Sequence, residues 1–206
     1  FQTTLPCTGF IMKQTNILSA AALTLLITAC ARPDLPQQNG WQPAETVNDF
    51  SAEGRIAVKL EGKGSYANFD WTYQNQVQTI NINTPIGSTV GQLCQDNQGV
   101  LAVDNKGRTY EAATAQELSN RLLGFELPIQ YLHIWASGKR VASAPYQLLP
   151  DSRLQQFDWT ISRTLNSNGK PKTLLLESPK LTLRLAFDNL DDHPEGDTQT
   201  QCAARK

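Results

Sequence analysis

The residues that could perform catalysis are few, and their spacing argues against an enzyme. The segment Gly87-Ser88-Thr89-Val90-Gly91 places a serine among glycines. A serine-hydrolase elbow requires G-x-S-x-G between a strand and a helix, whereas Ser88 directly follows Gly87 between two predicted strands. His133 falls on a predicted amphipathic helix near Trp135, with no acidic residue at a useful spacing. We therefore expect His133 to be a core or solvent-edge residue rather than a general base.

The other polar groups form no recognisable catalytic or metal-binding pattern. Asp96, Asp104 and Asp151 fall in predicted turns, where aspartate caps its own backbone. The sequence has only two histidines and no CxxC, HxxxH or HExxH spacing, so it predicts no zinc site. It also has no glycine-rich phosphate loop. We predict no catalytic residue, no metal and no cofactor.

Composition and charge exclude further classes of protein. The chain has 206 residues, with 18 Lys and Arg against 19 Asp and Glu. Such a balance provides no positive charge to hold a polyanion, so nucleic acid is not a predicted partner. Apolar residues make up 40% and charged residues 18% of the chain, which is typical of a folded domain and not of a charge-driven disordered one.

An apolar run near the N-terminus predicts a secretory leader. Met12 is the only methionine, so we interpret residues 1–11 as lying upstream of the start. Lys13, the apolar run 17–27 and the small residues before Cys30 have the order of a signal peptide over residues 12–29. The run is shorter than the roughly 20 residues that a membrane-spanning helix needs.

The segment Ile27-Thr28-Ala29-Cys30 resembles the bacterial lipobox, in which the cysteine is acylated and becomes the first residue. The resemblance implies a lipid anchor on Cys30, and two or more acyl chains hold a protein stably at a membrane. Ala31 stands where an aspartate would resemble an inner-membrane retention signal. The resemblance therefore implies an outer-membrane protein that faces the periplasm.

Two further cysteines, Cys94 and Cys202, belong to the predicted mature chain. An oxidising compartment permits a disulfide between them. The polar surroundings of Cys202 favour the alternative, that the two thiols stay unpaired.

The mature chain divides into a tether, a domain and a tail. Residues 30–44 contain Pro33, Pro36 and Pro43 among polar residues and predict an anchored spacer. Residues 45–190 carry the apolar patterns of one domain. Residues 191–206 have almost no large apolar side chain and predict a frayed polar tail.

Period-two alternation over the domain predicts antiparallel strands. Apolar residues share a face in each of four segments: Ile56, Val58 and Leu60; Phe69, Trp71 and Tyr73; Ile80 and Ile82; and Leu181, Leu183, Leu185 and Phe187. Turns at 96–99 and 104–107 bracket a short strand at 100–103, and 173–177 predicts another late strand.

Short helices interrupt this pattern. Thr114 to Glu117 fits a capping box, and Gly124 ends a predicted helix that contains Leu118 and Leu122. A second helix begins at Pro128 and ends before Gly138, and a further turn is predicted at 45–50. We predict a mainly β fold with α-helices: an unclosed antiparallel β-barrel of about nine to eleven strands, with a lid of two or three short helices.

Large aromatic residues in such a fold either fill a core or line a cavity. Sequence alone favours filling, but an unclosed barrel under a helical lid leaves a concave apolar face. The candidate acyl-chain cavity residues are Ile56, Val58, Phe69, Trp71, Ile80, Ile82, Leu101, Val103, Leu118, Leu122, Ile129, Leu132 and Trp135.

The segment 83–89 predicts an unusual turn. Pro85 and Gly87 impose the turn, and Ile86 occupies its tip, where a polar residue is more common. An exposed aliphatic tip indicates a surface that touches lipid or a partner. The alternative, that Ile86 packs into the core, stays open.

These motifs together resemble the LolB family of outer-membrane lipoprotein receptors. The resemblance covers most of the domain and rests on Phe50-Ser51-Ala52-Glu53-Gly54-Arg55, Phe69-Asp70-Trp71, Thr84-Pro85-Ile86-Gly87-Ser88-Thr89, Asp104-Asn105-Lys106-Gly107, Leu118 to Gly124, Leu127-Pro128-Ile129 and Ile134-Trp135-Ala136-Ser137-Gly138. It implies an unclosed barrel, shared with a soluble LolA-like carrier, whose cavity holds acyl chains.

The resemblance also implies a function and partners. A monomeric receptor would accept acylated lipoproteins from a LolA-like periplasmic carrier and insert them into outer-membrane lipid without covalent chemistry. The protruding loop, with Pro85, Ile86 and Gly87, would serve membrane delivery, although Ile86 replaces the usual leucine. Leu190 stands where the last strand often has a tryptophan. Two alternatives are a structural envelope lipoprotein with a filled core and an envelope hydrolase.

Overall fold

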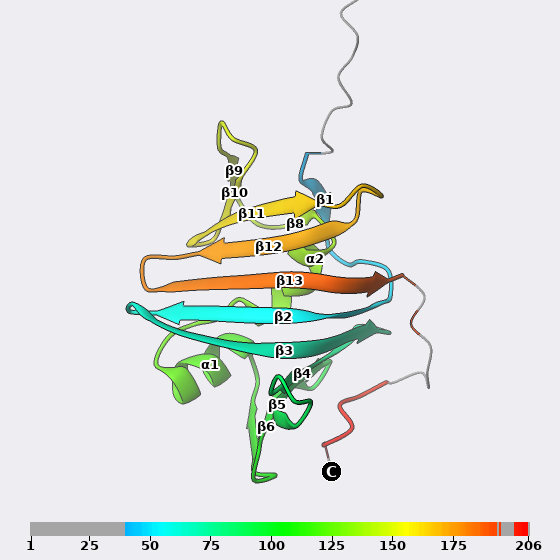
Figure 1. Cartoon of the computed structure of the whole chain (residues 1–206), viewed down its shortest axis with the longest axis vertical. Helices are drawn as coiled ribbons and strands as arrows, with labels where there is room; N and C mark the ends of the chain where they lie inside the picture. Colours follow the sequence, from blue (N-terminus) through cyan, green and yellow to red (C-terminus); the bar gives the residue numbers. More distant parts are fainter. Residues whose placement is uncertain (1–39, 193, 195–199, 206) are drawn as a thin grey trace, which may run out of the picture. The chain divides into compact units, whose positions relative to one another are not determined.

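The computed structural model describes residues 40–192, 194 and 200–205, and about half of them form a large antiparallel sheet (Figure 1). The strands are β1 (Gln42–Ala44), β2 (Phe50–Leu60), β3 (Lys63–Gln74), β4 (Val77–Asn83), β5 (Thr89–Asp96), β6 (Gly99–Asp104), β7 (Thr109–Ala112), β8 (Lys139–Val141), β9 (Tyr146–Leu148), β10 (Leu154–Gln156), β11 (Trp159–Leu165), β12 (Pro171–Glu177) and β13 (Leu181–Asp191). The helices are α1 (Ala115–Leu123), the 3-10 turn η1 (Ile129–Tyr131) and α2 (Leu132–Ala136). The predicted leader and Cys30 lie outside the described residues.

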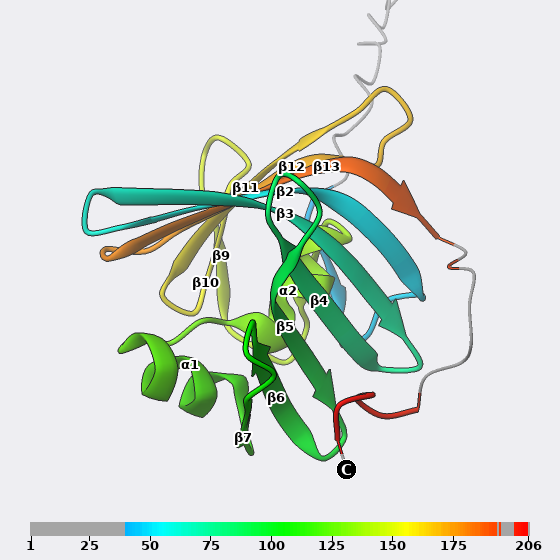
Figure 2. The ribbon, with the colours of Figure 1, turned by 60° about the horizontal axis from the view of Figure 1, so that its bottom comes forward.

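The large sheet has eleven strands in the order β7-β6-β5-β4-β3-β2-β13-β12-β11-β10-β9, and every neighbouring pair is antiparallel. Strands β7 and β9 are its two edges, so the sheet curves without closing (Figure 2). Strands β1 and β8 form a separate parallel pair. The predicted fold, an unclosed antiparallel barrel with short helices, is confirmed.

The helices begin and end where the sequence predicts. The Thr114 hydroxyl accepts a hydrogen bond from the Glu117 N–H at 3.1 Å, which caps the start of α1. Gly124 follows α1 with φ of 78°, and Gly138 follows α2 with φ of 77°. Both helices lie on the same side of the sheet (Figure 2), so they cover its apolar face. Among the described residues, no helix has the length and apolar character needed to cross a bilayer.

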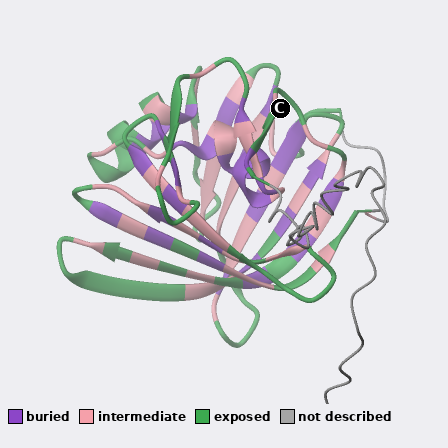
Figure 3. Cartoon of the chain, turned by 90° about the horizontal axis from the view of Figure 1, so that it is seen from above, coloured by how far each residue is buried: buried purple, intermediate pink, exposed green. Residues whose placement is uncertain are grey.

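Alternating burial along the strands separates an inner face from an outer face (Figure 3). The inner face of β3 carries Phe69, Trp71 and Tyr73, all buried. Trp135 of α2 is also buried, and its indole Nε1 donates to the side-chain Oε1 of Gln156 at 3.0 Å. The same oxygen accepts from the Val141 N–H at 3.0 Å. These bonds satisfy buried polar groups and fix α2 against β8 and β10.

The predicted spacer is wrong at its C-terminal end. Trp41 is buried, its Nε1 donates to the Ser152 carbonyl at 3.0 Å, and the Arg163 guanidinium lies 4.5 Å from the centre of its ring. Gln42 to Ala44 then pair with β8. The proline-rich composition gave no sign of these contacts, because Trp41 packs against residues more than a hundred positions away in the sequence.

The predicted helical turn at 45–50 is also wrong. Residues 46–49 contain no helix, and Phe50 begins β2. The Phe50 ring packs edge-on against Trp71, with ring centres 5.2 Å apart, and stacks on Tyr73 at 5.8 Å. These contacts require an extended backbone at Phe50, so tertiary packing overrides the local preference for helix.

The tail prediction is wrong for residues 200–205. Cys202 is fully buried and forms a disulfide with Cys94, with the two Cα atoms 5.8 Å apart. The Cys202 N–H donates to the Asp96 carboxylate at 2.8 Å, and the Arg205 guanidinium forms an ion pair with the same carboxylate at 2.8 Å. The unpaired-thiol prediction fails because the tail folds back onto β5 and β6, which composition does not reveal.

Candidate functional site

An apolar hollow of about 800 Å³ lies between the helical cover and the inner face of the sheet. Strands β2, β3, β4, β5 and β13 provide one wall, and α1, η1 and the residues near them provide the other. The lining residues are Ile56, Val58, Leu60, Glu61, Lys63, Ser65, Ile80, Ile82, Leu93, Leu118, Ser119, Leu122, Leu123, Phe125, Leu127, Ile129, Leu132, Leu181 and Leu183. The wall is therefore mainly aliphatic, with Glu61, Lys63 and Ser65 as polar residues near the β2–β3 turn.

Eight of the thirteen predicted cavity residues line this hollow: Ile56, Val58, Ile80, Ile82, Leu118, Leu122, Ile129 and Leu132. The strand residues reach it because alternate side chains point to the same face of a sheet. Those from α1 reach it because residues four apart lie on one side of a helix. Alternation alone also marks Leu181 and Leu183, which belong to the lining but were not among the predicted residues.

Three predicted aromatic residues fill the core instead. Phe69, Trp71 and Trp135 are buried and belong to the large hydrophobic cluster beside the hollow. Phe69 packs edge-on against Phe187, with ring centres 5.9 Å apart. The expectation that large aromatic residues fill the core is therefore correct for these three residues, and their selection as cavity-lining residues is wrong.

Leu101 and Val103 point to the other face of the sheet. Leu101 lies directly opposite Cys94, whose sulfur is bonded to Cys202 of the tail, so the buried Leu101 side chain shares the outer face with this disulfide. Their neighbour Val100 instead clusters with Ala115, Leu118 and Ile129 beneath the helices. All four residues from Val100 to Val103 are apolar, so alternation could not decide which pair faces inward.

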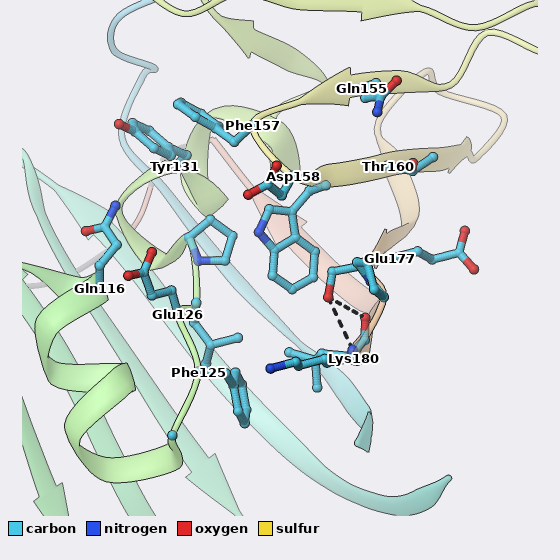
Figure 4. A pocket seen from close by; sticks show the side chains of 17 residues that line it. Gln116, Phe125, Glu126, Tyr131, Gln155, Phe157, Asp158, Thr160, Glu177 and Lys180 are labelled. Carbon is cyan, nitrogen blue, oxygen red and sulfur yellow. Dashed lines mark hydrogen bonds between the residues drawn. The ribbon is translucent and has the colours of Figure 1, made fainter. Parts of the chain in front are cut away.

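A second hollow, of about 870 Å³, adjoins the first and shares Phe125, Leu127 and Leu181 with it. Figure 4 shows Phe125 and Glu126, from the segment after α1, on one side, and Gln155 and Thr160, from β10 and β11, on the other. Its charged lining residues are Glu126, Asp158, Glu177 and Lys180. The apolar hollow therefore has a polar compartment next to it.

Stacked aromatic rings and a capped turn shape this polar compartment. Tyr131 and Phe157 stack with their ring centres 4.5 Å apart. The turn before β13 is held by the Leu181 N–H, which donates to the Ser178 hydroxyl at 3.2 Å, and by that hydroxyl, which donates to the Leu181 carbonyl at 3.3 Å. Both features belong to the lining of this compartment.

The β4–β5 loop presents an isolated aliphatic side chain. The Gly87 N–H donates to the Thr84 carbonyl at 2.9 Å, and the Thr84 N–H donates to the Ser88 carbonyl at 2.8 Å. Gly87 has φ of 89°, a conformation that glycine adopts without strain. This tight turn leaves Ile86 90% exposed. In Figure 2 the loop projects on the side of the sheet away from α1 and α2.

His133 is a core residue. Its ring stacks on Tyr73 with ring centres 4.5 Å apart, and burial lowers its pKa to about 4. The imidazole is therefore neutral at neutral pH, and its contacts are those of packing. Ser88 donates its N–H to the Thr84 hydroxyl at 3.1 Å within the turn, as expected for a loop residue rather than a nucleophile on an elbow.

Comparison with known proteins gives consistent matches. The family model for the outer membrane lipoprotein LolB matches residues 48–189. A Neisseria meningitidis protein named outer-membrane lipoprotein LolB is 59% identical over 186 residues, covering 90% of this chain and 96% of its own length. A protein of the same name from Chromobacterium violaceum is 28% identical over 82% of this chain and 94% of its own length. One from Klebsiella pneumoniae is 32% identical over 71% of this chain and 75% of its own length.

Proposed function

Because the chain belongs to the LolB family of outer-membrane lipoproteins, we propose that it receives acylated lipoproteins from a LolA-like periplasmic carrier and inserts them into the outer membrane. The chain acts as a monomer, anchored through acylated Cys30 after removal of residues 12–29. Residues 31–40 link the anchor to the domain. The acyl chains of the cargo occupy the apolar hollow, and no covalent bond is made or broken.

The observation that carries this proposal is the aliphatic hollow of about 800 Å³. Ligand sites typically have volumes of about 300–1,000 Å³, so the hollow is large enough for a hydrocarbon ligand. A structural lipoprotein with a filled core, the main alternative, has no use for such a space. The adjoining polar compartment, with Glu126, Asp158 and Lys180, suits the polar part of a lipidated protein.

The free energy of acyl-chain transfer explains why a receptor is useful. Each CH₂ group that moves from water into an apolar environment contributes about 0.8 kcal/mol, so exposing three acyl chains to water costs tens of kcal/mol. Transfer between two apolar hollows avoids this penalty. The direction of transfer then needs only that this chain bind the cargo better than the carrier does, and that the bilayer bind it better still.

The Ile86 loop assists the last step. An exposed aliphatic residue held by Pro85 and Gly87 on a short turn can enter the edge of a bilayer without unfolding the domain. Delivery would thus depend on Ile86, whereas uptake would depend on the hollow.

A transfer assay separates these two steps. A fluorescent triacylated lipopeptide is loaded on a LolA-like carrier, mixed with the mature chain carrying Cys30→Ala, and then exposed to lipid vesicles. We expect Ile86→Asp to take up the lipopeptide normally but to deliver it at least about tenfold more slowly, and Ile86→Leu to behave as the parent chain. Failure of the parent to take up the lipopeptide refutes the proposed function, and equal delivery by Ile86→Asp refutes the role of the loop.

A further inference from the structure

Tyr66 is the second most exposed large apolar side chain after Ile86 among the described residues, with 80% of its surface accessible. It lies on β3, two residues beyond Asn68, which forms the last β3–β4 pair with Asn83. The β4–β5 loop begins directly after Asn83, so Tyr66 lies at the end of the sheet from which the Ile86 loop leaves.

The strand register places Tyr66 on the outer face. Ser65 and its alternate neighbours line the hollow or the core, so Tyr66 points away from them. The same reasoning applies to β2, where Val58 and Leu60 line the hollow and Lys59 between them points outward. On β13, Leu183 lines the hollow, so its neighbour Arg184 points outward. The Ile86 loop projects on this same side of the sheet (Figure 2).

Tyr66 and two cations are neighbours across three strands. Arg184 lies opposite Ala57, and Ala57 lies opposite Tyr66, so the three form one row. Lys59 stands two residues from Ala57 on the same face of β2. Arg184 and Lys59 are both exposed, and within the described part of the chain neither forms an ion pair. We call Lys59, Tyr66, Ile86 and Arg184 the outer patch.

Two of the strand carboxylates on this face are already bound by other side chains. Asp70, which faces Glu53 across β2 and β3, accepts a hydrogen bond from the Asn83 side chain at the base of the Ile86 loop, and Asp188 is paired with Arg55 at 2.9 Å. Glu177 lies opposite Thr182, at the far end of the Lys59 row. Toward the β2–β3 turn, the face therefore presents two cations without ion pairs and a tyrosine, on the side of the sheet from which the Ile86 loop projects.

We propose that the outer patch docks this domain on an anionic lipid surface. The proposal rests on the delivery role of the Ile86 loop and extends it to a defined face. Tyrosine favours the membrane–water interface, because its ring is apolar and its hydroxyl stays wet. Lysine and arginine lay their apolar stems along such a surface and bring their charge to lipid phosphates. Ile86 would enter the bilayer while Lys59 and Arg184 hold the sheet against the headgroups.

Vesicle flotation tests this proposal. The mature chain carrying Cys30→Ala is mixed with neutral phosphatidylcholine vesicles or with vesicles containing about one third phosphatidylglycerol. We expect tighter binding to the anionic vesicles, weakened by salt. The Lys59→Gln/Arg184→Gln variant should lose about fivefold in binding for each cation removed. Tyr66→Ser should weaken binding to both vesicle types.

Matched variants elsewhere on the domain serve as controls. Lys172→Gln removes an exposed lysine that lies on the opposite face of the sheet, because Lys172 shares the face of β12 that carries the buried Leu174 and Leu176, and Tyr146→Ser removes an exposed tyrosine on the edge strand β9. Both should bind vesicles as the parent chain does. Thermal unfolding and lipopeptide uptake should be unchanged in every outer-patch variant, because these side chains are exposed.

Three results would overturn the proposal: equal binding of the parent to neutral and anionic vesicles, undiminished binding by the outer-patch variants, or equal losses in the controls. Such results leave the proposed function intact if the parent still takes up lipopeptide and Ile86→Asp still fails to deliver it. If uptake by the parent fails, the proposed function itself is refuted, whatever the vesicle binding.

Discussion

Cys94 and Cys202 are joined by a disulfide that links β5 to a tail segment 108 residues further along the chain. The tail is held there by polar contacts as well, because Asp96 accepts hydrogen bonds from the Cys202 N–H and from the Arg205 guanidinium. Burial alone would raise the pKa of Asp96, but these hydrogen bonds and the Arg205 charge lower it overall. The tail is thus part of the folded domain from Thr200 to Arg205.

Replacing both Cys94 and Cys202 by alanine should lower the free energy of unfolding by about 2–5 kcal/mol, because a bridge across a long loop restricts the unfolded chain. Urea denaturation checks this. The parent chain under reducing conditions serves as the control and should lose a similar amount. An unchanged midpoint in both samples would show that the disulfide contributes nothing to stability.

Gly54 leaves no room for a side chain on β2. A Cβ atom there would lie 2.1 Å from the Ala186 carbonyl oxygen and 3.1 Å from the Phe69 ring. We expect Gly54→Ala to reduce the free energy of unfolding by about 1–3 kcal/mol, as overpacking does. Gly64→Ala is the matched control, because nothing lies within 4 Å of its Cβ position. Similar melting temperatures for the two variants would contradict the close approach of β13 to β2.

His133 should make stability depend on pH. Its pKa is lowered to about 4 by burial, whereas the unfolded chain has the ordinary value near 6.5. As pH falls from about 6.5 to about 4, the unfolded state binds a proton that the folded state does not, so the free energy of unfolding decreases by about 3 kcal/mol. Denaturation curves of the parent and of His133→Gln across this range measure the effect. An equal slope in both chains would show that His133 titrates normally.

Ile82→Trp should fill the hollow and block uptake of acyl chains. Ile82 lines the space without being fully buried, so a larger ring can enter it while the fold persists. We expect at least about a tenfold loss in affinity for a fluorescent fatty acid, measured by titration. Val103→Trp is the control, because Val103 lies on the other face of β6. If Val103→Trp blocks uptake and Ile82→Trp does not, the assignment of the hollow is wrong.

Several features of the fold can be predicted from the sequence, because they depend on residues that are close together in the chain. Alternation identified Ile56, Val58, Ile80 and Ile82 as inward residues, since the opposite faces of their strands are polar. The caps at Thr114 and Gly124 marked the limits of α1. These features depend only on neighbours within a few residues.

The other features of the fold depend on contacts between residues that are far apart in the sequence, which local patterns do not reveal. Leu101 and Val103 could not be oriented, because both faces of β6 are apolar and the disulfide that brings the tail to the outer face of the neighbouring β5 joins residues 108 positions apart. Trp41 carries no local signal for its contact with Ser152. Whether Trp71 fills a core or lines a cavity depends on how the helices pack over the sheet, which periodicity does not encode.

Locating the bound acyl chain within the protein tests the proposed lipoprotein transfer most directly. A triacylated lipopeptide with a diazirine in one acyl chain is transferred from a LolA-like carrier to the mature chain carrying Cys30→Ala, irradiated, and mapped by mass spectrometry. We expect crosslinks to the aliphatic wall, at Ile56, Ile82, Leu118 and Leu183. Crosslinks confined to exposed apolar residues outside the hollow, such as Leu148 and Leu165, would contradict it.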